Sequence, residues 1–320
     1  MSNPSAHFYA QLLSKSIYQH DYASLTDWHQ DFLKTTKHLS STLQQAALGG
    51  RYSHNMSFAF SAGYQSALHA LFKPTIRTLS SLCVTEKEGN LPKHIQSCLS
   101  QEEKGWQLSG EKSFITGASE AKQLYIAVKA LQKPKQAPAD RPKIKMLSIA
   151  SASAGIEITA MPALPFVPDI SHGTASFNRV EIQASQILTG DGHSQYVKPF
   201  RTYEDIHVLA AITGFRIGEA INSNWSSQSI EAHLTLLTSL LSLNPDNFDD
   251  ATTHIIFSGC RTQFNELVQQ TDKEFERNNT VGFDYWKRDK ALLGIASKAH
   301  EVRTQRAWDN IFSELNHAKV

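Results

Sequence analysis

Residues 105–117 of this 320-residue chain read GWQLSGEKSFITG, and this stretch decides the fold. Its tryptophan, leucine, phenylalanine and isoleucine are typical of β-strands bounded by turn residues. We predict one strand over residues 105–110, ended by a turn at Gly110, and a second strand over residues 112–116 that returns from that turn. The stretch therefore predicts a β-rich centre for the chain.

Other strand signals surround this stretch within residues 77–190. They are short apolar runs at residues 82–84, 124–128, 144–149, 156–160 and 175–182. Many short strands in succession predict a β sandwich or barrel. Residues 133–142 contain three prolines among mixed charges, and we expect them to form a surface loop.

Helical patterns flank the β-rich zone on both sides. Residues 5–73 lack proline, and their last apolar run at helical spacing stops before Pro74. We expect Gly49 and Gly50 to mark a turn ahead of that run. Further helices are predicted over residues 203–217, 230–243, 250–277 and 283–317. The three zones predict three domains: N-terminal helices at residues 1–76, a β domain at residues 77–192 and a C-terminal helical bundle at residues 193–320.

The composition argues against several classes of protein. Lysine and arginine total 31 against 30 acidic residues, so the net charge of +1 gives none of the basic field that nucleic-acid binding needs. The three cysteines, Cys83, Cys98 and Cys260, lack paired spacing, which argues against a disulfide framework or a metal site. No apolar run approaches the ~18 residues of a membrane helix, and no signal peptide is evident. We expect a cytoplasmic protein without metal, nucleic-acid partner or membrane insertion.

Three blocks of the β-rich zone resemble the flavin-binding β domain of the acyl-CoA dehydrogenase family. They are LCVTE at residues 82–86, the stretch at residues 105–117, and FNRVEI at residues 177–182. The resemblance covers residues 50–225 well and residues 283–310 loosely. It implies an α+β fold with N-terminal helices, a central β sandwich or barrel and a C-terminal helical bundle, and it implies FAD as the cofactor.

The resemblance also assigns residues to the flavin. An isoalloxazine ring needs hydrogen bonds at its pyrimidine edge and at N5, which gain electron density on reduction. By resemblance, the Val84 backbone and Thr85 face the pyrimidine edge. Thr116 approaches N5 and Phe114 covers one ring face, while Asn90 stands where the family has a phosphate-binding serine. The alternative is that Thr85 and Thr116 are ordinary strand threonines.

The catalytic base is assigned in the same way. Oxidation of an acyl thioester removes an α proton, which requires a carboxylate near the acyl chain. At the commoner of the two positions used in the family this chain carries Ser297, which cannot act as a base unaided. The other position lies on the first helix after the β domain and corresponds to Glu204, with Asp205 beside it. Alternatively, Glu204 is a carboxylate that faces the helix dipole near a helix N-terminus.

The resemblance implies an FAD-dependent oxidoreductase that abstracts an α proton and transfers a β hydride to the flavin. Its partner would be an acyl thioester of CoA or of a carrier protein, and the assembly a homodimer or tetramer. Residues 87–90 read KEGN in place of a Gly-Ser-Asp segment, and Glu88 adds negative charge near the expected phosphates. This departure favours the alternative, a divergent homologue without dehydrogenase activity that serves as a binding or assembly module.

Overall fold

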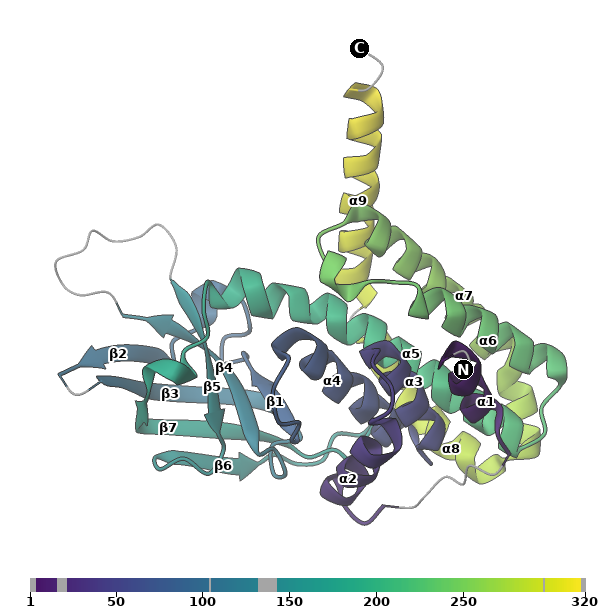
Figure 1. Cartoon of the computed structure of the whole chain (residues 1–320), viewed down its shortest axis with the longest axis horizontal. Coiled ribbons are helices and arrows are strands. Elements are labelled where there is room, and N and C mark those ends of the chain that lie inside the picture. The colour runs from purple at the N-terminus through teal and green to yellow at the C-terminus, as the bar shows by residue number, and fades with distance from the viewer. Residues whose placement is uncertain (1–3, 16–21, 104, 132–142, 296, 318–320) are drawn as a thin grey trace. The chain divides into compact units, whose positions relative to one another are not determined.

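The computed structural model describes residues 4–15, 22–103, 105–131, 143–295 and 297–317 (Figure 1). Helices come first, then seven strands in the described part, then helices again, as predicted. The chain divides into two compact units. The helical unit comprises residues 1–70, 165–167 and 202–320, and the β unit comprises residues 71–164 and 168–201. The surface loop predicted at residues 133–142 falls almost entirely outside the described residues.

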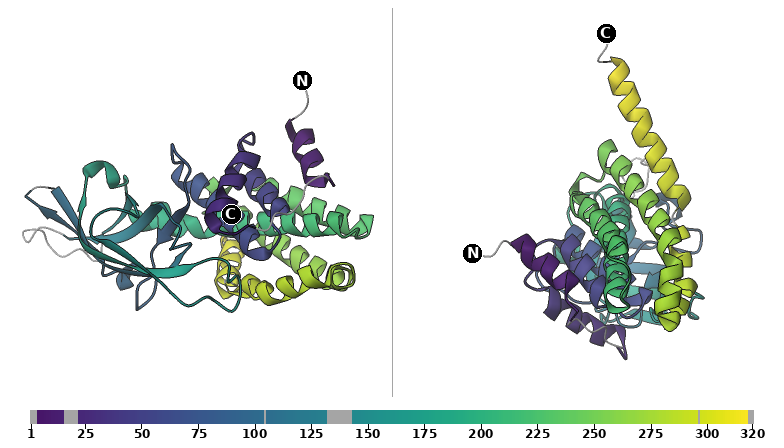
Figure 2. Two further views of the ribbon diagram at one scale, coloured as in Figure 1. Left: turned by 90° about the horizontal axis from the view of Figure 1, so that it is seen from below. Right: turned by 90° about the vertical axis from the view of Figure 1, so that its right-hand side faces the viewer.

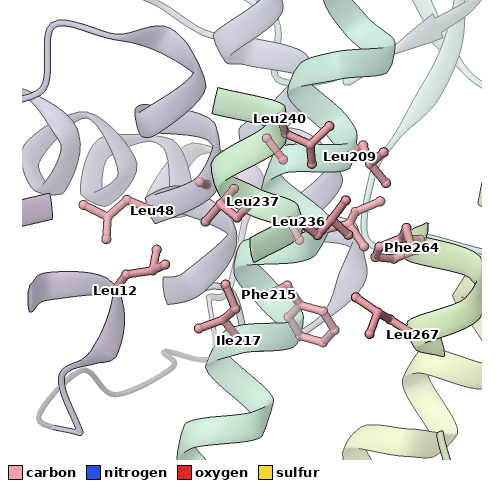
Figure 3. Packing of buried hydrophobic residues seen from close by; sticks show 14 of the residues in the cluster. Leu12, Leu48, Leu209, Phe215, Ile217, Leu236, Leu237, Leu240, Phe264 and Leu267 are labelled. Carbon is pink, nitrogen blue, oxygen red and sulfur yellow. The ribbon is translucent and has the colours of Figure 1, made fainter. Parts of the chain in front are cut away.

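The helices at the two ends of the chain share one hydrophobic core. The helices from the two ends of the chain lie side by side (Figure 2). Leu12 and Leu48 belong to the same buried cluster as Phe215, Leu237 and Phe264 (Figure 3). The two helical zones, which the sequence pattern treats as separate domains, thus complete each other's apolar faces. The helices are α1 (Pro4–Leu13), α2 (Leu25–Thr36), α3 (Thr42–Tyr52), α4 (Met56–Phe72), α5 (Lys198–Asn222), α6 (Ser227–Leu241), α7 (Ala251–Asn278), α8 (Thr280–Asp289) and α9 (Ser297–His317). Among the described residues, none of the helices has the length and apolarity needed to cross a membrane.

Glycines set the distance between α3 and α5. A Cβ atom added to Gly50 would lie 1.8 Å from the Ala211 carbonyl oxygen, and one added to Gly214 would lie 2.0 Å from the Ala47 carbonyl oxygen. The two backbones therefore touch at reciprocal sites about one turn apart on each helix. The turn predicted at residues 49–50 is wrong, because these glycines lie inside α3 and serve close helix packing.

The β unit is built on one hydrogen-bonded sheet. Its strand order is β1-β4-β2-β3-β7-β6, with β5 paired to β4. β1 and β2 both run parallel to β4, at its two ends, and the remaining pairs are antiparallel. One apolar cluster draws residues from six of these strands. The strands are β1 (Ser80–Cys83), β2 (Cys98–Glu102), β3 (Gly105–Thr116), β4 (Gln123–Ala130), β5 (Ile144–Ala150), β6 (Ile156–Ala160) and β7 (His172–Ile182).

The hairpin predicted within residues 105–116 is wrong. These residues form the single long strand β3, and the hairpin partner is the preceding strand β2, which pairs through Glu102 and Gly105. Gly110 has φ +138°, and the register with β7 shifts beside it, so it makes a bulge instead of a turn. A Cβ at Gly110 would lie 2.5 Å from Ser97, so glycine is also required for space.

We predict that Gly50→Ala lowers the free energy of unfolding by about 2–3 kcal/mol, because the new methyl group overlaps the α5 backbone. Urea denaturation monitored by circular dichroism measures this change. The matched control is Gly259→Ala in α7, where a Cβ would meet nothing within 4 Å. That substitution should stabilise the chain by about 0.5–1 kcal/mol, the helix-propensity gain of alanine. Equal effects of the two substitutions would contradict the close contact.

Candidate functional site

The end of β1 lies beside the end of β3 and brings three assigned flavin residues together. The Ser113 backbone N–H donates to the Thr85 carbonyl at 2.8 Å, and the Ser81 hydroxyl donates to the Thr116 carbonyl at 2.5 Å. Val84 is buried next to Thr85, and both threonines are half-buried. Two segments about 30 residues apart in the sequence thus lie side by side, with Thr85 opposite Ser113 and Thr116 opposite Ser81.

Phe114 stands out at this edge for its backbone and its exposure. Its φ is +53°, in the left-handed region that bulky side chains rarely adopt, and the ring is 57% exposed. An exposed aromatic ring on a strained backbone is available for stacking with a planar ligand. Asn90 is also exposed and lies just beyond the turn that joins Glu86 to Gly89.

A buried ion pair holds the loop that follows β1. The Lys112 ammonium lies 2.6 Å from Glu86 Oε1 and donates to the Val84 carbonyl at 3.2 Å. The backbone N–H groups of Gln96 and Ser97 donate to the same carboxylate at 2.7 and 3.1 Å. The loop is fixed against β3 by three donors on the buried carboxylate and by the hydrogen bond from Lys112 to Val84. Sequence reasoning missed this pair, because Glu86 and Lys112 were only parts of the family blocks.

The environment of Glu86 favours its ionised form. Burial raises the pKa of Glu86, but the Lys112 ammonium and the two backbone donors together hold that pKa below its ordinary value. For Lys112, burial lowers the pKa, and Glu86 offsets part of that effect. Each charge therefore depends on the other to remain buried.

Next to this pair lies a hollow of about 940 Å³ lined by the loop, β3, β6 and β7. With the ion pair neutral overall, the exposed carboxylates of Glu88, Glu111 and Glu157 outnumber the ammonium of Lys87. Of the residues assigned to the flavin, Phe114 lines this hollow, whereas Val84, Thr85, Asn90 and Thr116 are not part of its wall. The Phe114 ring and the hydroxyl groups of the wall fit a flavin ring, which carries no charge. An excess of carboxylates suits a diphosphate poorly, because like charges repel. The residues fit the ring end of FAD better than its phosphates.

Glu204 lies on α5 in the helical unit and lines a pocket of about 190 Å³. Most of the pocket wall is hydrocarbon, and its charged or polar members are Asp205, Arg261 and His300 in addition to Glu204. Part of the wall comes from the link between α8 and α9, where the long helix predicted over residues 283–317 is interrupted by a 3-10 turn, Lys290–Gly294. The apolar lining residues are Phe60, Val208, Leu209, Ile212, Phe257, Leu292, Leu293 and Ile295.

Asp205, next to Glu204, is committed to an ionic network. Arg303 of α9 donates to Asp205 Oδ2 at 2.5 Å and to His300 Nδ1 at 2.9 Å. His300 Nε2 lies 3.3 Å from Asp205 Oδ1. Asp205 therefore joins α5 to α9, and Glu204 is the other carboxylate of the pocket. The partners on α9 could not be found from the sequence, because they lie about 100 residues away from Asp205.

His207 anchors the turn of α5 that carries Glu204. Its imidazole is fully buried, with Nδ1 2.7 Å from the Tyr203 carbonyl and Nε2 2.9 Å from Thr42 Oγ1 on α3. Burial lowers the pKa of His207 to about 4, so the ring is neutral at pH 7. A neutral ring donates through Nδ1 and accepts the Thr42 hydroxyl through Nε2. This bridge fixes the rotation of α5 and hence the position of Glu204.

The fold agrees with that of the acyl-CoA dehydrogenases. The chain has their fold: butyryl-CoA dehydrogenase from Megasphaera elsdenii superposes with a TM-score of 0.62 and 12% identity, over 96% of this chain and 90% of that one. An acyl-CoA dehydrogenase from Slackia heliotrinireducens gives 0.60 and 13%, over 99% and 98%. A structure of PigA with FAD and proline gives 0.63 and 14%, over 97% and 98%. No protein-family model and no curated protein sequence matches the chain. The fold class predicted from the sequence is confirmed.

We predict that Lys112→Met lowers the free energy of unfolding at pH 7 by about 3–5 kcal/mol, because it leaves the Glu86 carboxylate buried without its partner. Denaturant titration measures the loss. Lys87→Met on the exposed side of the same loop is the matched control and should change stability by less than about 0.5 kcal/mol. A small effect of Lys112→Met would show that water reaches Glu86.

The Glu86 carboxylate should make the unfolding free energy of the chain depend on pH. Since the pKa of Glu86 is lower in the folded state than in the unfolded state, its ionisation stabilises the fold fully above pH ~4–5. That stabilisation is lost as the pH falls further. We therefore expect Glu86→Gln to show a shallower decline in unfolding free energy between pH 5 and about pH 3 than the wild type does, measured by urea titration. Parallel declines would contradict the assignment.

Proposed function

We propose that the chain is an FAD-dependent oxidoreductase that dehydrogenates an acyl thioester, with Glu204 as the general base. The observation that carries the proposal is the pocket in which Glu204 lies. It combines a hydrocarbon wall with a carboxylate, and the neighbouring Asp205 is engaged by Arg303 and His300. This combination is what removal of a proton from carbon beside an apolar chain requires.

The chemistry assigned to the chain's own residues is a proton transfer. The acyl chain fills the apolar pocket and excludes water, which strengthens a carboxylate as a base. The α C–H bond breaks, its proton moves to a Glu204 oxygen, and its electron pair forms the new carbon–carbon double bond. Bound FAD supplies the two-electron acceptor that takes the β hydrogen as a hydride.

The pocket volume supports a short acyl group. An apolar cavity of about 150 Å³ accommodates a molecule of the size of benzene. The 190 Å³ beside Glu204 is only slightly larger. We therefore propose that the acyl portion buried in it contains about five or six non-hydrogen atoms. The thioester carrier, CoA or a carrier protein, would remain outside this pocket.

The edge of the β unit is the proposed place for the flavin ring. Val84 and Thr85 would serve its pyrimidine edge, Thr116 its N5, and the exposed ring of Phe114 one of its faces. Asn90 would donate to a phosphate. The hydrogen bonds that join the Thr85 and Thr116 backbones to Ser113 and Ser81 support this grouping. PigA, which has the same fold, has a structure with FAD and proline.

A second function is favoured by the acidic hollow beside Phe114. Because Glu88, Glu111 and Glu157 disfavour a diphosphate, a chain that binds no FAD would keep the scaffold only as a binding or assembly module. The two functions differ in one measurement, the flavin absorbance of the purified chain after incubation with FAD. Stoichiometric yellow colour supports the oxidoreductase, and a colourless chain supports the module.

We predict that Glu204→Gln abolishes acyl thioester oxidation in the flavin-loaded chain. The amide keeps the shape of the side chain but cannot take the α proton, so flavin bleaching in stopped-flow should fall at least about 100-fold. Flavin binding and melting temperature should stay close to the wild type. Glu231→Gln, on an exposed position of α6, is the matched control. Full activity in Glu204→Gln would remove Glu204 from the mechanism.

We predict that Thr116→Val slows flavin reduction on the order of 10²-fold, since one hydrogen-bond donor near N5 is lost. The backbone carbonyl that accepts from Ser81 is kept, so the fold should not change. Thr116→Ser retains the hydroxyl and should restore most of the rate. Identical single-turnover rates in the valine and serine variants would place Thr116 outside the flavin site.

A further inference from the structure

Arg261 of α7 lies between two adjoining hollows of the helical unit. It lines the apolar pocket that contains Glu204 and also a second hollow of about 390 Å³ between α7 and α9. Phe257 and His300 are shared by both hollows as well. The wall of the second hollow also contains the carboxylate of Glu301, and otherwise it is mainly hydroxyl and amide groups: Ser258, Thr262, Asn265, Ser297, Thr304 and Gln305. One guanidinium group therefore stands where an apolar pocket gives way to a polar one.

The charge of Arg261 is poorly compensated for its degree of burial. Its side chain is half-buried, and its guanidinium donates to the Ser297 hydroxyl at 3.3 Å. Among the described residues no carboxylate lies at ion-pair distance from it, and Asp205 is already engaged by Arg303 and His300. Burial and the nearby Arg303 lower the pKa of Arg261, and the carboxylates of Asp205 and Glu301 only partly offset this.

Arg216 of α5 shows what a compensated guanidinium looks like in the same unit. It is fully buried, and it pairs with Asp272 at 3.0 Å and donates to the Thr271 hydroxyl at 2.5 Å. Its guanidinium carbon also lies 4.7 Å from the centroid of the Trp286 ring. Within the described part of the chain, Arg261 has no carboxylate at ion-pair distance and no aromatic ring stacked on its guanidinium, and it donates to Ser297.

We infer that Arg261 binds an anionic group at the far end of the acyl substrate, namely a carboxylate, so that the preferred substrates are short dicarboxylic acyl thioesters. This inference rests on the proposed function. The carboxylate would accept two parallel N–H donors from the guanidinium. The methylene groups between it and the thioester would lie against Val208, Ile212 and Leu292. The small pocket holds the thioester carbonyl and three methylene groups of a five-carbon chain, and the terminal carboxylate reaches Arg261 where the second hollow begins.

Binding of free acids to the full chain tests the inference without flavin. Glutarate and valerate have the same number of carbons and differ by one carboxylate. Calorimetry should give a Kd for glutarate at least about tenfold lower than for valerate, and Arg261→Met should erase that difference. Arg261→Lys should keep part of it. The matched control, Arg277→Met, removes an exposed arginine from the other end of α7 and should change nothing.

Two results would overturn the inference. One is equal affinity of the wild type for glutarate and valerate. The other is an Arg261→Met variant that weakens both acids alike or simply melts earlier, which would mean that Arg261 only joins α7 to α9 through Ser297. Because the ligand comparison in the wild type needs no variant, a poorly folded Arg261→Met would still leave the inference open to refutation.

The oxidation of thioesters separates this inference from the proposed function. In the flavin-loaded chain, kcat/KM for glutaryl-CoA should exceed that for valeryl-CoA at least about tenfold, and Arg261→Met should remove the preference by lowering kcat/KM for glutaryl-CoA far more than for valeryl-CoA. Oxidation of both thioesters at equal rates would refute the role of Arg261 and keep the function. Selective glutarate binding without oxidation of either thioester would support the role of Arg261 and refute the proposed function.

Discussion

The contact between α3 and α5 is the constraint on which the site depends. Gly50 and Gly214 let the two backbones meet, and the His207 bridge to Thr42 fixes how α5 is rotated about its axis. Glu204 lies one turn before His207 on that helix. A register shift of one residue between the helices would turn the carboxylate by about 100° and remove it from the pocket wall. The glycines thus determine where the carboxylate lies, although they have no chemistry of their own.

The balance of charge distinguishes structural ions from ions available to a ligand. The pair of Glu86 and Lys112 is complete, with the carboxylate further bound by two backbone donors, and it stiffens a loop. Arg216 is likewise matched by Asp272. The Arg261 side chain is half-buried, and its hydrogen bond to Ser297 and the nearby carboxylates compensate its charge only in part. The net charge of the whole chain is +1, and this sum does not reveal the local excess of positive charge at Arg261.

Sequence patterns predicted the elements whose signal lies in consecutive residues. The apolar runs of β4 and β5 are of this kind. β2 was missed because CLSQE has no apolar run, and its pairing with β3 supplies the stability that its composition does not. Gly110 was assigned to a turn because glycine adopts a positive φ in turns and in bulges alike. Only the tertiary structure, in which Ser97 lies against Gly110, distinguishes the two.

The pocket was beyond prediction for a related reason. Glu204 was assigned through its resemblance to a family position, but Arg261 and His300 come from α7 and α9, and no local pattern links them to α5. Side chains that meet only in the tertiary structure leave no trace in a single sequence. The one long helix expected over residues 283–317 also concealed the link that supplies Leu292, Leu293 and Ile295 to the wall.

That link has a consequence for how such a pocket can change over evolutionary time. The 3-10 turn Lys290–Gly294 joins α8 to α9, and three of its residues, Lys290, Ala291 and Gly294, take no part in the wall. Insertions or deletions in a short connection are tolerated far better than those inside a packed helix. A change of one residue there would move Leu292 and Leu293 while α7 and α9 keep their packing. The size of this pocket is therefore open to selection through the link, without a change in the helices that form the rest of its wall.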